Sequence, residues 1–123
     1  MNPADLFSKE PNPVNLAPGE VLFKAGDPGD TMYVVLEGTL DVLVGDRLVE
    51  KSVRGDLIGE MALIDQSPRS GTVVASEPAK LAKLDTAHFQ RIIQLNPFFA
   101  THVMKILVNR IRRNDDRLKQ VNA

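Results

Sequence analysis

Cysteine is missing from this sequence and histidine occurs only twice, so several classes of site are excluded at the outset. Without cysteine, the chain forms no disulfide and offers no thiolate ligand to a metal. His88 and His102 are far apart from each other in the sequence, which argues against a histidine-based zinc site. We expect both to lie on helix faces with no chemical role, and we expect no metal and no cofactor.

Strong net charge, long apolar runs and an export signal are also absent. The net charge of -1 argues against direct, charge-driven binding to nucleic acid. No apolar run approaches the ~20 residues that span a bilayer. The N-terminus lacks the basic start and apolar stretch of a signal peptide. These absences predict a soluble, cytoplasmic protein with no membrane segment.

What is present is the pattern of a small β domain. The length of 123 residues fits one domain, and the 43% hydrophobic fraction is enough for a core. Short apolar segments recur between turn signals such as Pro18-Gly19 and Gly45-Asp46, which is typical of a sandwich or jelly-roll barrel. The predicted strands are residues 14–16, 21–23, 31–36, 39–44, 47–53, 57–58, 72–75 and 80–84.

From residue 85 the pattern becomes helical. Asp85 or Thr86 can cap a short helix that reaches Leu95, and Pro97 suits the first turn of a long helix towards Lys119. On the long helix an apolar seam follows heptad spacing. Its members are Met104, Leu107, Ile111, Asn114, Leu118 and Val121. Phe99, Val103 and Ile106 form a neighbouring stripe that we expect to pack on the barrel. The seam either forms a homodimer or joins this stripe in one broad face.

These patterns divide the chain into three parts. Residues 1–12 are an N-terminal arm, in which Leu6 and Phe7 either dock as a short helical turn or belong to a loosely held segment. Residues 13–84 are a β-roll. Residues 85–123 are a helical lid and dimerisation segment. The expected fold is therefore mostly β with C-terminal helices: a jelly roll, or cupin-like double-stranded β-helix, followed by a short helix and a long one.

One stretch of the roll, residues 59–72, combines a carboxylate, a guanidinium and a small-residue turn. Glu60 can accept hydrogen bonds from a diol, and Arg69 can bind a phosphate or carboxylate bidentately. Backbone N–H groups near Ala62 add to an anion site if a short helix begins at Gly59 or Glu60. We expect Met61, Leu63 and Ile64 to root the stretch in the core. The alternative interpretation is that Glu60 and Arg69 form an ion pair on the surface.

Three stretches of the sequence form one pattern. The first is residues 26–38, a turn, a strand and a glycine. The second is Arg54-Gly55-Asp56-Leu57-Ile58-Gly59-Glu60, and the third is residues 59–72. Together they resemble the cyclic nucleotide-binding domain family, and the third is similar to the phosphate-binding cassette of that family. Ile58 departs from the family pattern, where an aromatic residue is frequent, and so does Gly71, where alanine is usual. Neither departure removes a ligand group.

The resemblance implies a role for each cassette residue. It assigns Glu60 to the ribose 2′-hydroxyl and Arg69 to the cyclic phosphate. The backbone of Gly59 and Ala62 lines the ribose and phosphate, and Ser70 adds a hydroxyl or an amide to the phosphate. Met61 is included in the same ligand-binding set.

The base is less well determined by the resemblance. In dimeric bacterial members of the catabolite-activator type, polar residues of the last helix reach the purine, which places Asn114 near the base. Asn114 also interrupts the seam, where an asparagine can instead set the helix register. We expect cAMP as the ligand, with cGMP less favoured.

The expected function is a cyclic nucleotide-binding regulatory module that transmits binding through its C-terminal helices to a dimer or an unknown effector. The alternative is a sensor domain of a longer transcription factor, channel or other effector. No helix-turn-helix segment follows the long helix in this sequence, so we expect no direct DNA binding. No nucleophile elbow, Walker loop or metal-ligand cluster is present, and we therefore expect no enzyme.

Overall fold

The computed structural model describes residues 2–122, except for the side chains of Ile64 and residues 114–122. The chain divides into two compact units, Met1–Phe89 and Gln90–Ala123, and each is described by itself. The first unit holds the strands, a short 3-10 helix η1 (Pro3–Phe7) and helix α1 (Glu60–Asp65). The second holds helix α3 (Pro97–Asn122), and the boundary falls within helix α2 (Thr86–Leu95).

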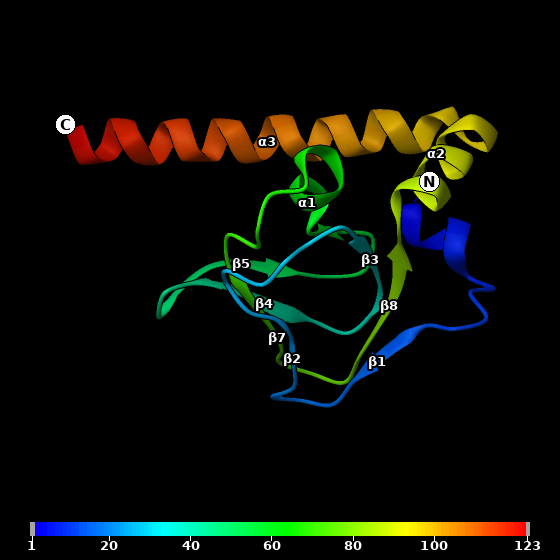
Figure 1. Ribbon diagram of the computed structural model, residues 1–123. Helices are drawn as coiled ribbons and strands as arrows, with labels where there is room; N and C mark the ends of the chain where they lie inside the picture. Colours follow the sequence, from blue (N-terminus) through cyan, green and yellow to red (C-terminus); the bar gives the residue numbers. More distant parts are fainter. Residues whose placement is uncertain (1, 123) are drawn as a thin grey trace. The chain divides into compact units, whose positions relative to one another are not determined.

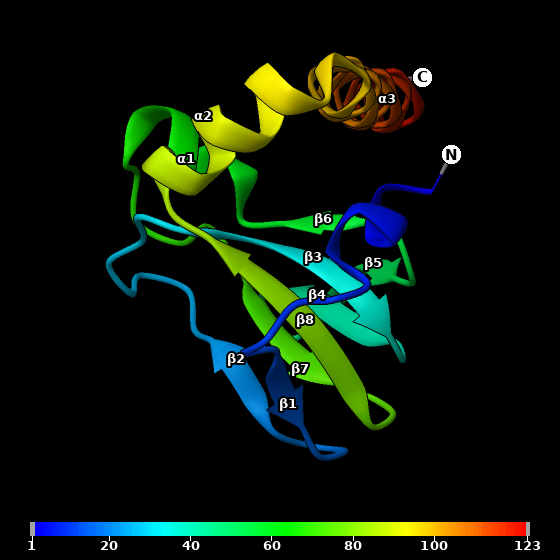
Figure 2. The ribbon, with the colours of Figure 1, turned by 90° about the vertical axis from the view of Figure 1, so that its right-hand side faces the viewer.

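Eight strands form two antiparallel sheets of four (Figures 1 and 2). In the first sheet the order is β1-β8-β3-β6, with bounds Val14–Leu16, Ala79–Leu84, Met32–Glu37 and Leu57–Ile58. In the second the order is β2-β7-β4-β5, with bounds Val21–Phe23, Thr72–Ala75, Leu40–Val44 and Arg47–Ser52. Because the chain passes repeatedly from one sheet to the other, the strands form a roll. The predicted jelly roll followed by helices is confirmed.

Buried apolar side chains lie between the two sheets and also on the outer face of the first sheet. Inward-facing side chains such as Tyr33, Val35 and Leu81 belong to one buried cluster with Leu40 and Val73. β3 is buried continuously over residues 32–36 instead of alternating. The reason is that η1 and α1 both contact β3, so its residues on either face are covered.

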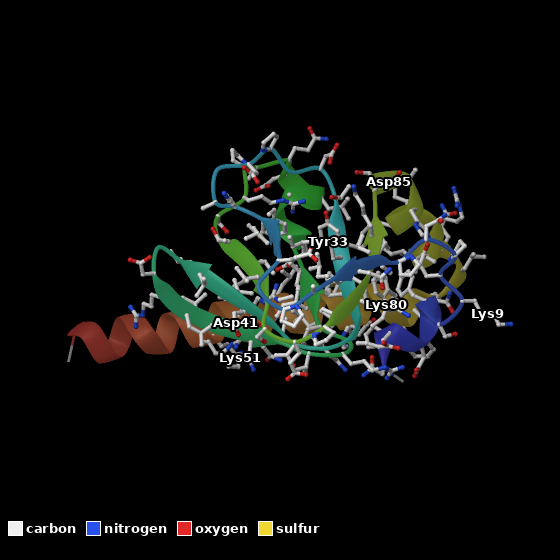
Figure 3. All side chains as sticks on the ribbon, turned by 90° about the horizontal axis from the view of Figure 1, so that it is seen from below. Lys9, Tyr33, Asp41, Lys51, Lys80 and Asp85 are labelled. Atoms are coloured by element: carbon white, nitrogen blue, oxygen red, sulfur yellow. The ribbon has the colours of Figure 1, made fainter. Side chains whose placement is uncertain are left out.

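The surface of the roll carries ordinary cross-strand pairs. Lys51 Nζ lies 2.8 Å from Asp41 Oδ1, and the two residues are directly opposite each other on β5 and β4. Figure 3 shows this pair on the outside of the roll, whereas Tyr33 lies among the side chains between the strands. Such exposed pairs contribute little, about 0–1 kcal/mol. The fold therefore depends on the apolar core between the sheets.

The N-terminal arm docks as a short helical turn, which was one of the two predicted alternatives. Asn2 caps η1, since its Oδ1 accepts a hydrogen bond of 2.9 Å from the Ala4 N–H. Phe7 is buried, and its ring meets His88 edge-on with 6.3 Å between centroids. Asp5 pairs with Arg54 at 2.6 Å.

The two predicted C-terminal helices are present. Asp85 caps α2, because its Oδ1 accepts a 2.8 Å hydrogen bond from the His88 N–H, and Pro97 begins α3. On α3, Phe99 and Val103 are buried, whereas the seam residues Met104 and Ile111 are 58% and 60% exposed. Leu107 is half-buried, and the side chains of the remaining seam residues Asn114, Leu118 and Val121 lie outside the described part of the structure. Among the described residues, no helix is long and apolar enough to span a membrane.

Candidate functional site

Glu60 is positioned by a two-residue strand and a left-handed glycine. β6 is fixed to β3 through the pairs Tyr33–Ile58 and Val34–Leu57. Gly59 then takes φ +78°, a conformation that L side chains rarely adopt, and turns the chain into α1. Glu60 is the first residue of α1 and is only 5% exposed. The carboxylate is thus held at the end of a buried strand instead of on the surface.

Arg69 is held by the loop between β2 and β3. The Gly26 N–H donates to the Arg69 carbonyl oxygen at 2.8 Å, and the Arg69 N–H donates to the Asp27 carbonyl oxygen at 2.9 Å. The Arg69 side chain is 7% exposed. Since Glu60 and Arg69 are both buried, the interpretation of the two as an exposed surface pair is wrong.

The guanidinium of Arg69 is fixed at one end by Thr31. Nη1 donates to the Thr31 carbonyl oxygen at 2.9 Å and to the Gly59 carbonyl oxygen at 3.4 Å. Nη2 donates to the Thr31 hydroxyl at 3.2 Å. Cζ of the guanidinium lies over the Phe23 ring, 4.2 Å from the ring centroid. These contacts come from neutral groups, and they set both the position and the plane of the cation.

The Nε–H edge of the guanidinium has no hydrogen-bond partner among the described residues. The Nε–H itself is buried. It shares an edge of the planar group with the second Nη2–H, and such an edge matches two oxygens of a phosphate or carboxylate. A buried polar group without a partner is unfavourable, and a buried cation is most stable beside an anion. The arrangement fits a small anionic ligand.

The residues packed beside this edge are small. A Cβ placed on Gly29 would lie 2.7 Å from Arg69 Nε and 2.9 Å from the Cβ of Ala62. A Cβ on Gly59 would collide with Arg69 Nη1. Two glycines and an alanine therefore form a cradle around the guanidinium that larger residues would fill.

The structure brings several of the predicted site residues together. Gly59, Ala62 and Arg69 are close neighbours, and the Ala62 N–H donates to the Gly59 carbonyl oxygen at 3.2 Å. Ser70 is exposed. The side chain of Asn114 lies outside the described residues, so its predicted role near the base stays a prediction. Leu63 is buried as expected, whereas the side chain of Ile64 is not described.

The prediction that Met61 is rooted in the core is wrong, because its side chain is 54% exposed. α1 is a short helix with one buried face. Ala62 and Leu63 occupy that face at 4% and 7% exposure, which directs the preceding residue towards solvent. A contact between Met61 and a ligand remains a prediction.

Three residues that hold Arg69 were missed by sequence reasoning. Phe23 and Thr31 looked like ordinary strand positions, and Gly29 looked like an ordinary turn residue. The only signal was that Gly29 and Thr31 belong to residues 26–38, one of the stretches that carries the family resemblance. Phe23 precedes that stretch and nothing in the sequence connects it with Arg69.

The loop between α1 and Arg69 has its own internal support. Gln66 ends α1 in a left-handed conformation with φ 58°. The Ser67 hydroxyl donates to Asp65 Oδ1, and the Ser67 N–H donates to the same oxygen at 3.0 Å. The hydroxyl bond is the main reason why the pKa of Asp65 is lowered, and the backbone bond adds to it. These bonds favour the ionised carboxylate and shape the turn that leads into Arg69.

A roll with a buried, pre-oriented arginine at a small-residue cradle defines a binding module for a small anionic ligand. Comparison with known families agrees with this class, because the cyclic nucleotide-binding domain matches residues 13–96. The chain belongs to the cyclic nucleotide-binding domain family, and the resemblance noted in the sequence is confirmed.

Individual relatives span regulatory proteins of different kinds. A cAMP-dependent protein kinase regulatory subunit of Colletotrichum orbiculare is 37% identical over 78 residues, which are 62% of this chain and 20% of that protein. The chain thus spans about a fifth of the length of the curated relatives it matches, 20% and 17% for the first two. Two of the proteins to which the chain is similar are named as a regulatory subunit and an activator.

Two solved structures share the fold over most of the chain. The Thermus thermophilus catabolite activator protein has a TM-score of 0.79 and 28% identity, covering 90% of this chain and 55% of that chain. A structure from work on a cyclic-GMP-dependent signalling pathway that regulates bacterial phytopathogenesis has a TM-score of 0.74 and 26% identity. It covers 89% of this chain and 90% of that one.

Proposed function

We propose that this chain is a regulatory sensor that binds cAMP in preference to cGMP and has no catalytic activity of its own. The observation that carries the proposal is the buried Arg69, whose Nε lies beside Gly29 and makes no hydrogen bond with the described residues. A cyclic phosphate has a single negative charge and two exocyclic oxygens. It matches the free edge of the guanidinium in both charge and spacing.

Each residue of the cassette has a role in this proposal. Arg69 binds the exocyclic oxygens through Nε and Nη2, while Thr31 keeps the other end of the guanidinium fixed. Glu60 accepts a hydrogen bond from the ribose 2′-hydroxyl. The backbones of Gly59 and Ala62 line the ribose and phosphate, with Met61 and Ser70 at the exposed rim and Asn114 at the base.

The preference for cAMP has support from the relatives. The kinase regulatory subunit that is 37% identical to this chain is named for its dependence on cAMP. The structure connected with a cyclic-GMP-dependent pathway is 26% identical and keeps cGMP as the second candidate. Both ligands share the phosphate and ribose that the cassette would hold, so the difference between them lies in the base.

The C-terminal helices are the proposed output. Ligand binding shifts their equilibrium between two positions, and the ratio of affinities in the two positions limits the available switching energy. The exposed apolar residues Met104 and Ile111 of α3 support a homodimer as the recipient of the signal. The alternative is that a separate effector protein binds this surface and receives the signal.

Titration calorimetry tests the ligand. cAMP and cGMP are titrated side by side, with linear 5′-AMP as the control that carries the same base on an open phosphate. Arg69→Ala removes charge-assisted bonds of about 1.5–3 kcal/mol, so affinity should fall at least about tenfold. Arg69→Lys keeps the positive charge but loses the bidentate donor geometry, so its affinity should lie between those of the wild type and Arg69→Ala. Thermal unfolding of each variant checks that the domain stays folded.

The outcomes separate the proposal from its alternatives. Wild-type protein that binds neither cyclic nucleotide, or an Arg69→Ala variant with unchanged affinity, contradicts the proposal. Tighter binding of cGMP overturns the preference alone. Chromatography of the ligand after incubation should recover the cyclic nucleotide intact, and recovery of the linear nucleotide would identify an enzyme instead.

A further inference from the structure

Phe23 lies directly against the guanidinium of Arg69, although the two residues are far apart in the sequence. Phe23 is the last residue of β2, and it pairs with Val73 of β7, which begins three residues after Arg69. The pairing of β2 with β7 thus places the Phe23 ring beside Arg69. Cζ of Arg69 lies 4.2 Å from the Phe23 ring centroid and 5.9 Å from that of Tyr33.

This contact differs in kind from the hydrogen bonds at the site. A cation over a ring face is attracted by the ring quadrupole, and the attraction grows when the cation is shielded from water, as Arg69 is at 7% exposure. The in-plane N–H groups take no part in it. Phe23 can therefore fix the plane of the guanidinium while leaving the Nε–H and the second Nη2–H available.

Thr31 and Phe23 together determine the orientation of the guanidinium. Thr31 accepts hydrogen bonds from Nη1 and Nη2 and thereby fixes one end of the group. The Phe23 ring fixes its plane. With one end and the plane determined, the remaining edge is directed towards Gly29.

We propose that Phe23 is a positioning residue for the anion-binding site. Its ring holds Arg69 in the binding orientation before the ligand arrives, so the conformational entropy of the arginine is not lost at the moment of binding. The inference rests on the proposed function and deepens it, because it assigns a role to a residue outside the cassette. An ordinary packing role is the alternative, since Phe23 also packs against the core cluster.

Two substitutions at Phe23 separate these roles. Phe23→Leu keeps an apolar side chain but removes the ring, and Phe23→Tyr keeps the ring face. Calorimetry with cAMP should show affinity about threefold to thirtyfold weaker for Phe23→Leu and nearly unchanged for Phe23→Tyr. In the Arg69→Ala background, Phe23→Leu should have no further effect, because the residue that it positions is gone.

A second measurement needs neither a variant nor a ligand. In a nitrogen-15 NMR spectrum of the wild-type protein, the Arg69 Nε–H should be displaced from the usual arginine position by the ring current of Phe23. An ordinary Nε–H position contradicts the stacked geometry, even in the case that Phe23→Leu does not fold.

The results also distinguish this inference from the proposed function. Wild-type protein that binds neither cAMP nor cGMP overturns both. Wild-type binding with an equal affinity for Phe23→Leu overturns the positioning role alone. A loss of stability in Phe23→Leu without a loss of affinity identifies Phe23 as a core residue only.

Discussion

Gly29 and Arg69 are packed so closely that an added methyl group on Gly29 would lie 2.7 Å from Arg69 Nε and 2.9 Å from Cζ. The contact joins the loop between β2 and β3 to the cassette. φ of Gly29 is not in the left-handed region, so the absence of a side chain matters here for space and not for backbone conformation. The guanidinium can take this position only because Gly29 has no side chain.

We expect Gly29→Ala to weaken cyclic nucleotide binding and to lower stability to some extent. The added methyl group meets both the held guanidinium of Arg69 and the Cβ of Ala62, and a displaced guanidinium no longer faces the ligand. Loss of one charge-assisted bond corresponds to about 1.5–3 kcal/mol, hence affinity about tenfold lower or worse. Calorimetry and thermal unfolding give the two quantities. The neighbouring, exposed Pro28→Ala is the control, and equal affinities of both variants would contradict the expectation.

Gly59→Ala should reduce both binding and stability. The left-handed backbone at φ +78° costs a residue other than glycine about 1–2 kcal/mol, and the added Cβ also collides with Arg69 Nη1. Gly19→Ala is the matched control, since it has φ +86° and nothing within 4 Å of its added Cβ. Denaturant unfolding should show similar losses for the two variants. Calorimetry should show weaker binding for Gly59→Ala alone, and a normal affinity would falsify the collision.

The strands and the two C-terminal helices could be predicted because each of them has a local signal. Residues 31–36 are rich in β-branched and aromatic types, and the structure has β3 at Met32–Glu37. The helix start at Pro97 and the cap at Asp85 follow from the chemistry of helix ends. The separation of Gly59-Glu60 from Pro68-Arg69 is specific enough to indicate the family from the sequence alone.

The surroundings of Arg69 could not be predicted, because they depend on strand pairing. The hydrogen bonds to Thr31 join residues that are 38 positions apart. The Phe23 ring reaches Arg69 only because β2 pairs with β7, and nothing in either strand specifies the other as its partner. The burial of Met61 could not be predicted for a different reason. A helix of six residues has fewer than two turns, which is too short for the sequence pattern to define its buried face.

The pKa of Asp65 should rise towards the ordinary aspartate value in Ser67→Ala. The Ser67 hydroxyl and N–H both stabilise the ionised carboxylate, and the substitution removes the hydroxyl. Because the folded pKa is lowered, the stabilisation is fully present above the unfolded pKa of about 3.9 and is lost as the pH falls through the folded value. Carbon-13 NMR of the Asp65 carboxyl group during a pH titration measures the shift. Ser70→Ala is the control and should leave the Asp65 titration unchanged, whereas an unshifted titration in Ser67→Ala would exclude the hydroxyl as the cause.

The last prediction concerns the exposed seam of α3. If Ile111 is buried in a homodimer, each side chain contributes about 1.5–3 kcal/mol, so Ile111→Asp should raise the dimer dissociation constant at least about a hundredfold over two copies. Asn109→Asp adds the same charge at an exposed position of α3 that heptad spacing places farthest from the seam. Sedimentation velocity with and without saturating cAMP measures the self-association. Dimers in Asn109→Asp and monomers in Ile111→Asp are expected. Dimers in both variants would show that self-association uses a surface other than this seam, and monomeric wild-type protein would leave a separate effector as the recipient of the signal.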